Sequence, residues 1–197
     1  MLIGLYGGSF NPIHTGHIRL GQWLVRHDLV DELWFLVSPQ NPLKPAAGLL
    51  DDDARLSLAR LAIGRKRRLR VSDFEFHLPR PSYMVTTLEG LREAYPGHDF
   101  ALVIGADNWY RFPQWYQSDV ILAHHRILVY PRPGFPIDGS QLPPTVSLVN
   151  TPLYDLSSTQ IREAIATEGT DYDGHGLEPR VWEEIKAKGY YLNQAQV

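Results

Sequence analysis

Two histidines near the N-terminus have the residue type and the spacing of a phosphate-binding site. His14 and His17 end the segment Gly7-Gly8-Ser9-Phe10-Asn11-Pro12-Ile13-His14-Thr15-Gly16-His17. Apolar residues before it (2–6) predict a short buried strand, and apolar spacing after it predicts a helix over 16–28. Residues three apart on the first turn of a helix share one face, so both imidazoles would point the same way. The glycine pair allows the main chain to approach a phosphate closely, and the positive end of the helix favours an anion.

An H-x-x-H pair is also compatible with two idle surface histidines or with two metal ligands. The metal interpretation is weak, because the chain has no cysteine and no H-E-x-x-H pattern or third ligand follows. The strand, the glycine pair and Pro12 in front of the histidines favour phosphate. We therefore expect no metal site made of protein ligands.

Composition narrows the class of protein. A chain of 197 residues with 44% hydrophobic and 21% charged residues is typical of one globular domain. No run of eighteen apolar residues and no leader pattern occurs, so we expect no membrane partner and a cytoplasmic location. The net charge of −3 argues against a nucleic-acid partner. The basic run Arg65-Lys66-Arg67-Arg68 is predicted to be a solvated helix end that complements the helix dipole.

Alternating strands and helices predict an α/β fold. We expect a Rossmann-like, doubly wound, mostly parallel sheet with helices on both faces and a C-terminal helical piece. The predicted strands cover 2–6, 32–37, 69–72, 100–104, 127–130 and 146–149, and the helices cover 16–28, 51–63, 82–95, 160–167 and 178–188. One domain would span 1–197, with 157–197 as its C-terminal helical segment. Ligands of such sheets bind beyond the carboxyl ends of the strands, where the glycine turn, Lys44, Asp107 and Arg132 all fall.

A second stretch, Leu156-Ser157-Ser158-Thr159-Gln160-Ile161-Arg162, also precedes a predicted helix. Taken alone, its three hydroxyl residues are most simply explained as a helix cap. The arginine that follows them, together with the N-terminal histidine motif, favours a second phosphate-binding helix start instead.

Together the two stretches resemble the HxGH and SSTxIR-type signatures of the nucleotidyltransferase superfamily. The resemblance is closest to the bacterial nicotinate-nucleotide adenylyltransferases and covers nearly the whole chain. It runs in order through Asn41-Pro42-Leu43-Lys44, Arg80-Pro81-Ser82-Tyr83, Ile104-Gly105-Ala106-Asp107, Phe112-Pro113-Gln114-Trp115-Tyr116 and Arg132-Pro133-Gly134. It implies transfer of AMP from ATP to nicotinate mononucleotide, which forms deamido-NAD (nicotinate adenine dinucleotide) and pyrophosphate in NAD biosynthesis.

The residue types fit that chemistry. The attacking group is a phosphate oxygen that is already largely ionised near neutral pH, so no protein base is required. Charge builds on the α-phosphate and on the leaving pyrophosphate, and positioning with cationic or N–H donors is the main catalytic resource.

The resemblance also implies a role for each matched residue. The catalytic residues would be His14, His17, Lys44 and Arg162, with His17 nearest the α-phosphate. The ATP site would comprise Gly7, Gly8, Ser9, Phe10, Gly105, Asp107, Arg132, Ser157, Ser158 and Thr159. The mononucleotide would contact Asn41, Ser82, Tyr83, Met84, Trp115 and Tyr116. Mg²⁺ would accompany ATP, held mostly by phosphate oxygens and water.

Several matched positions have simpler explanations when the residues are considered alone. Lys44 could be solvated, Asp107 could cap a helix, and Trp115 could belong to the core. Met84 stands where the family usually has threonine, and Leu43 stands where many relatives have histidine. The acceptor therefore stays open between nicotinate mononucleotide, nicotinamide mononucleotide and another phosphorylated acceptor such as phosphopantetheine. A nucleotide-binding regulator ranks lower, since both motif histidines are present, and a homo-oligomer is left open.

Overall fold

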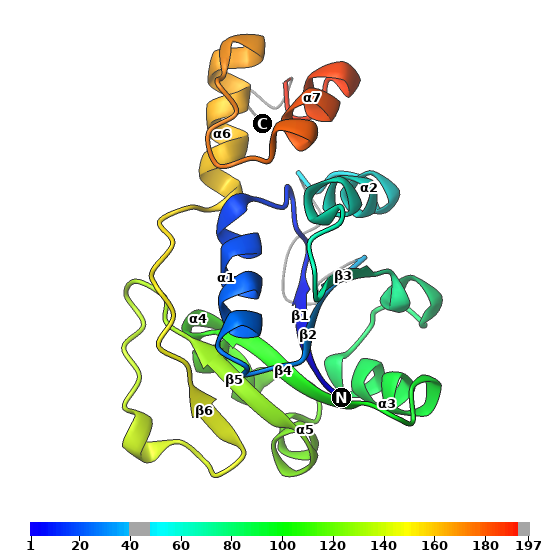
Figure 1. Cartoon of the computed structure of the whole chain (residues 1–197), viewed down its shortest axis with the longest axis vertical. Coiled ribbons are helices and arrows are strands. Elements are labelled where there is room, and N and C mark those ends of the chain that lie inside the picture. Colours follow the sequence, from blue (N-terminus) through cyan, green and yellow to red (C-terminus); the bar gives the residue numbers. More distant parts are fainter. Residues whose placement is uncertain (40–47, 193–197) are drawn as a thin grey trace.

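The structure is a computed structural model that describes residues 1–39 and 48–192. Its sheet has the strand order β3-β2-β1-β4-β5-β6, and every neighbouring pair of strands is parallel. The strands are β1 (Leu2–Gly8), β2 (Glu32–Val37), β3 (Leu69–Ser72), β4 (Asp99–Gly105), β5 (Arg126–Tyr130) and β6 (Val146–Leu148). The chain direction across the sheet reverses between β1 and β4, which is where ligands bind in this class of fold. The predicted Rossmann-like sheet is confirmed (Figure 1).

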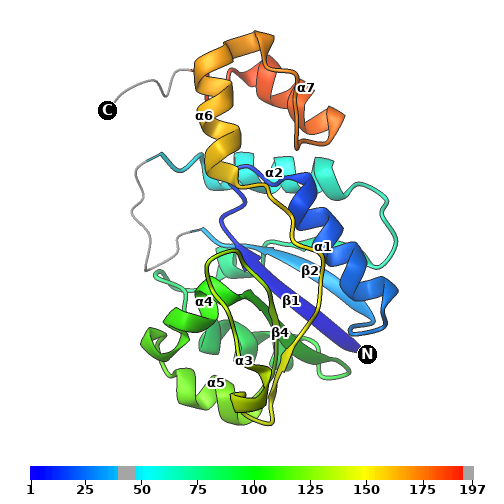
Figure 2. The same ribbon diagram turned by 90° about the vertical axis from the view of Figure 1, so that its left-hand side faces the viewer.

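Helices cover both faces of the sheet (Figure 2). One apolar core lies under α1 (Thr15–Arg26) and α2 (Asp52–Ile63). The other core lies under α3 (Met84–Ala94), α4 (Ala106–Arg111) and α5 (Ser118–His124). Because both faces are covered, the central strands are almost continuously apolar, as the sequence indicates.

The C-terminal helices α6 (Ser158–Glu168) and α7 (Pro179–Lys188) lie at one end of the molecule, beyond α1 and α2 (Figure 1). Ile165 and Trp182 belong to the same core cluster as the apolar residues of α1 and α2. The Tyr191 hydroxyl donates to Asn11 Oδ1 at 2.8 Å, which ties the C-terminal segment to the N-terminal motif. These contacts between the C-terminal helices and the rest of the chain support the expectation of a single domain. The domain assignment stays a prediction.

Some elements differ from the sequence-based expectation. Helices α4 and α5 were not predicted, because the aromatic residues around Pro113 show no helical periodicity. In the basic run, Lys66 Nζ donates to the Ala62 carbonyl at 2.6 Å, which confirms the helix-end assignment. The expectation that the whole basic run is solvated is wrong for Arg68. Its guanidinium donates to the carbonyls of Val25, Val30 and Asp31.

The described residues contain no helix with both the length and the apolar character needed to cross a membrane.

Candidate active site

His14 and His17 lie at the start of α1, and their imidazole rings stack with centres 3.6 Å apart and planes 26° apart. The His14 backbone N–H donates to His17 Nδ1 at 3.1 Å. Because Nδ1 accepts this bond, a neutral His17 carries its proton on Nε2. The rings of Tyr6 and Phe10 flank His17, with centres 5.9 and 5.1 Å away. These contacts fix the orientation of His17 before any ligand binds.

His14 is a buried, neutral imidazole. Burial, followed by the positive charge of Arg132, lowers its pKa from 6.5 to about 4. Its Nδ1 is buried and has no hydrogen-bond partner among the described residues. A bound anion would stabilise the protonated form and raise this pKa, so the group is suited to contact a phosphate.

Gly7 and Gly8 belong to the end of β1, which continues two residues beyond the predicted strand. A Cβ on Gly7 would lie 3.2 Å from Met84 Cε, and one on Gly8 would lie 3.1 Å from the Phe10 ring. The Met84 and Phe10 side chains therefore pack closely against the two glycines, and a phosphate approaching the glycines stays a prediction. The turn itself begins at Ser9, and Phe10 adopts a left-handed φ of 44° with its ring in the core.

The start of α6 contacts the loop in front of α1. Ser158 Oγ donates to the Pro12 carbonyl at 2.9 Å, across 146 sequence positions. Arg162 Nη1 donates to the Asn11 carbonyl at 2.7 Å and Nη2 to Thr159 Oγ1 at 3.4 Å. The two sequence motifs are thus brought together in space.

The hydroxyl residues of the second motif are already engaged within the protein. Ser157 caps α6, since its Oγ accepts from the Gln160 N–H at 3.1 Å while Gln160 Oε1 accepts from the Ser157 N–H at 2.9 Å. The cap explanation is therefore right for Ser157. An anion at this helix start would instead meet the backbone N–H groups of Ser158 and Thr159, which have no partner within the helix.

An ion pair lies at the ends of β4 and β5. Asp107 Oδ1, in the first turn of α4, is 3.6 Å from Arg132 Nε, and both side chains are about one-third exposed, at 34% and 37%. A Cβ on Gly105 would overlap Asp107 Oδ1 and lie 3.0 Å from Arg132 Cγ. A glycine at the end of β4 therefore allows the carboxylate and the guanidinium to lie side by side at the site.

Sequence reasoning missed a pair of tyrosines. Tyr6, two residues before the end of β1, and Tyr130, the last residue of β5, bring their hydroxyls to within 3.2 Å of each other. Burial raises the pKa of both, so both stay protonated at neutral pH. One hydroxyl donates to the other, and the second proton can point toward a ligand. In the sequence, the only indication that these tyrosines could belong to the site is their position near the carboxyl end of a predicted strand.

Several of these groups line one small cavity that is open to solvent. Its lining includes Tyr6, His14, His17, Tyr130, Arg132 and Tyr154. Residues 152–156, which lead into the second motif, also contribute. The imidazoles and the segment that leads into α6 therefore line one cavity, and a triphosphate that contacts both helix starts stays a prediction.

Two of the residues expected to hold the acceptor, Tyr83 and Tyr116, are neighbours in space. The rings of Tyr83 and Tyr116 lie 4.7 Å apart, and Tyr116 is 54% exposed. Met84 packs toward Gly7, as noted above. Trp115 is half-buried against Phe112, and its indole N–H is buried without a hydrogen-bond partner among the described residues.

Ser82 lies behind this cluster. It is buried, and its hydroxyl donates to Glu75 Oε2 at 3.3 Å, while Thr87 donates to Glu75 Oε1 at 2.9 Å. Its hydroxyl is therefore hydrogen-bonded within the protein, and a contact between Ser82 and the mononucleotide stays a prediction.

Two predicted site residues, Asn41 and Lys44, lie outside the described residues, so their roles stay predictions. Within the described ranges, no group of three or more histidine, cysteine or acidic side chains is arranged to hold a metal ion.

In a parallel sheet of this kind, ligands bind beyond the carboxyl ends of the strands, where the strand order reverses. The family model for cytidylyltransferase-like proteins matches residues 5–164, and the chain belongs to that family. The probable nicotinate-nucleotide adenylyltransferase of Bacteroides thetaiotaomicron is 54% identical over 98% of this chain and 93% of its own. That of Bacteroides fragilis is 51% identical over 92% and 90%. The resemblance to nicotinate-nucleotide adenylyltransferases drawn from the motifs is thereby confirmed.

A solved structure shows the same fold. The nicotinic acid mononucleotide adenylyltransferase of Plasmodium falciparum, complexed with NaAD, superposes with a TM-score of 0.82. The alignment covers 96% of this chain and 97% of that one at 21% sequence identity.

Proposed function

We propose that the protein transfers AMP from ATP to nicotinate mononucleotide and forms deamido-NAD and pyrophosphate, a step of NAD biosynthesis. The observation that carries this proposal is the direct contact between the two motifs, in which Ser158 donates to the Pro12 carbonyl and Arg162 donates to the Asn11 carbonyl. Relatives with more than half of their residues identical, named for this activity, support it. We place the reaction in the cytoplasm, with ATP and the mononucleotide as its partners.

In the proposed reaction a phosphate oxygen of the mononucleotide attacks the α-phosphorus of ATP. The bond from that phosphorus to the bridging oxygen breaks, and pyrophosphate leaves with the electron pair. His17 Nε2–H would donate to the α-phosphate, where charge accumulates in the transition state. The N–H groups at the start of α6, with Arg162, would hold the β- and γ-phosphates.

The remaining groups orient the two substrates. Asp107 would accept hydrogen bonds from the adenosine ribose, and Arg132 would add positive charge near the phosphates. Trp115 would stack on the pyridine ring, with its unpartnered N–H beside the ligand. Enzymes of this family generally use a divalent metal with ATP, and Mg²⁺ on phosphate oxygens and water would lower the charge that repels the nucleophile.

A side-by-side panel of acceptors tests the proposal. With ATP and Mg²⁺, we expect pyrophosphate release to be about tenfold or more faster with nicotinate mononucleotide than with nicotinamide mononucleotide, since a site built for a carboxylate leaves donors unpaired with an amide. Phosphopantetheine should give no release. Equal or reversed rates for the two mononucleotides would contradict the acceptor assignment. No release with any acceptor would favour a nucleotide-binding regulator.

A further inference from the structure

A buried arginine lies next to the nucleotide turn but outside the cavity described above. Arg55, on α2, is the largest fully buried side chain of the described residues, with an exposed fraction of 0%. Sequence reasoning treated it only as part of a helix. Burying a guanidinium destabilises the folded state unless every N–H donor has a hydrogen-bond partner. The partners of Arg55 therefore indicate which segments it holds together.

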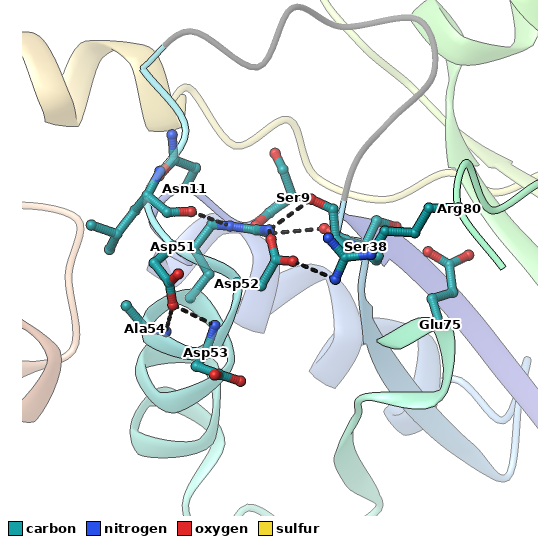
Figure 3. A network of polar contacts seen from close by, with 12 residues as sticks. Ser9, Asn11, Ser38, Asp51, Asp52, Asp53, Ala54, Glu75 and Arg80 are labelled. Atoms are coloured by element: carbon teal, nitrogen blue, oxygen red, sulfur yellow. Dashed lines mark hydrogen bonds and ion pairs between the residues drawn. The ribbon is translucent and has the colours of Figure 1, made fainter. Parts of the chain in front are cut away.

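All five N–H donors of Arg55 are matched. Nη1 donates to the carbonyls of Ser9 at 2.6 Å and Ser38 at 2.9 Å. Nε donates to the Leu50 carbonyl at 2.8 Å, and Nη2 donates to the Pro39 carbonyl at 3.1 Å and to Asp52 Oδ1. Figure 3 shows this network around Ser9, Ser38 and Asp52. No other side chain offers five donors in a fixed plane.

One of these partners, Ser9, is predicted to belong to the ATP site. Ser9 is the first residue of the turn after β1, and the next residue, Phe10, packs edge-on against His17. Ser38 and Pro39 follow the end of β2. One guanidinium therefore fixes the nucleotide turn against the neighbouring strand end, at the edge of the sheet where ATP is proposed to bind.

A second step of the network leads toward the acceptor. Asp52 Oδ2 accepts from Arg80 Nη2 at 2.8 Å, and Arg80 lies just before the segment with Tyr83 and Met84 (Figure 3). The Ser38 side chain, in turn, hydrogen-bonds to Glu75, which holds Ser82. Two polar links thus run from the nucleotide turn to the acceptor segment.

We propose that Arg55 is a positioning residue for the transfer reaction, a role that rests on the proposed function. It holds the backbone of the nucleotide turn, sets Phe10 and thereby His17, and through Asp52 aligns the turn with the acceptor segment. A displacement of about 1 Å in the reacting groups lowers the rate of the chemical step by a large factor. We therefore expect loss of the Arg55 hydrogen bonds to lower kcat.

The test compares Arg55→Lys with Arg60→Gln. The lysine keeps the charge but has three donors on one nitrogen and cannot reach all five acceptors. Arg60 lies on the same helix and loses only an exposed ion pair with Asp73 when replaced. At a temperature where both variants are folded by circular dichroism, we expect kcat to fall about tenfold or more in Arg55→Lys and to stay within about twofold in Arg60→Gln. The imidazole NMR signals of His17 should shift in the first variant alone.

The two readouts separate this proposal from the proposed function. If the native enzyme forms no deamido-NAD, the proposed function fails, while a His17 shift confined to Arg55→Lys still supports the anchor. A lower Tm with unchanged kcat and unchanged His17 signals would overturn the positioning role. If Arg55→Lys does not fold, the same NMR measurement is made on Asp52→Asn. Shifted His17 signals in that variant would support the positioning role of Arg55, and unshifted signals would overturn it.

Discussion

Replacing His17 with alanine is expected to lower kcat about 10²- to 10³-fold while ATP affinity falls less than tenfold. The side chain is held in place by the His14 N–H and by the Phe10 ring, so its Nε2 proton is aimed before substrate binds. A preorganised donor at the atom where charge develops stabilises the transition state more than the ground state. Steady-state kinetics together with calorimetric titration of ATP measure the two effects separately.

His27→Ala is the matched control for this variant. His27 follows the last residue of the same helix, and its ring stacks on Trp23 with centres 4.0 Å apart. Its removal should leave kcat within about twofold, as for a surface substitution far from the site. Weaker ATP binding with unchanged kcat in His17→Ala would show that His17 binds substrate without stabilising the transition state.

Replacing Arg162 with alanine is expected to lower kcat/KM about 10²-fold. The guanidinium donates to the Asn11 carbonyl and so joins α6 to the first motif. It is also proposed to place a positive charge beside the triphosphate. Arg162→Lys should recover part of the loss, because it restores the charge but not the fork of donors.

Arg180→Ala, on the exposed surface of α7, is the control for Arg162→Ala and should behave like the native enzyme. An Arg162→Ala enzyme with native kcat/KM for both substrates would remove the second motif from the proposed reaction.

Most of the fold follows from local patterns in the sequence. Apolar runs bounded by turn residues located all the strands of the sheet, and the alternation with helices gave its parallel order. Helices α4 and α5 could not be foreseen, because these short helices are stabilised by packing of Ala106 and Ile121 into the second core. Their apolar spacing alone is too brief to show a period.

The candidate site was predictable where the chemistry resides in a contiguous motif. The two motifs come together in space, since Arg162 donates to the Asn11 carbonyl and each motif lies at a helix start. The close packing of Met84 and Phe10 against Gly7 and Gly8 could not be predicted, because a sequence shows a missing Cβ but not the side chain that lies beside it. Tyr130 and Arg55 were missed, since their function depends on partners far away along the chain.

A crystal structure with an unreactive ATP analogue tests the central claim most directly. We expect a single triphosphate within hydrogen-bonding distance of the His17 imidazole and, at the same time, of the backbone N–H groups of Ser158 and Thr159. An analogue that touches one of these helix starts while the other faces solvent would contradict the account.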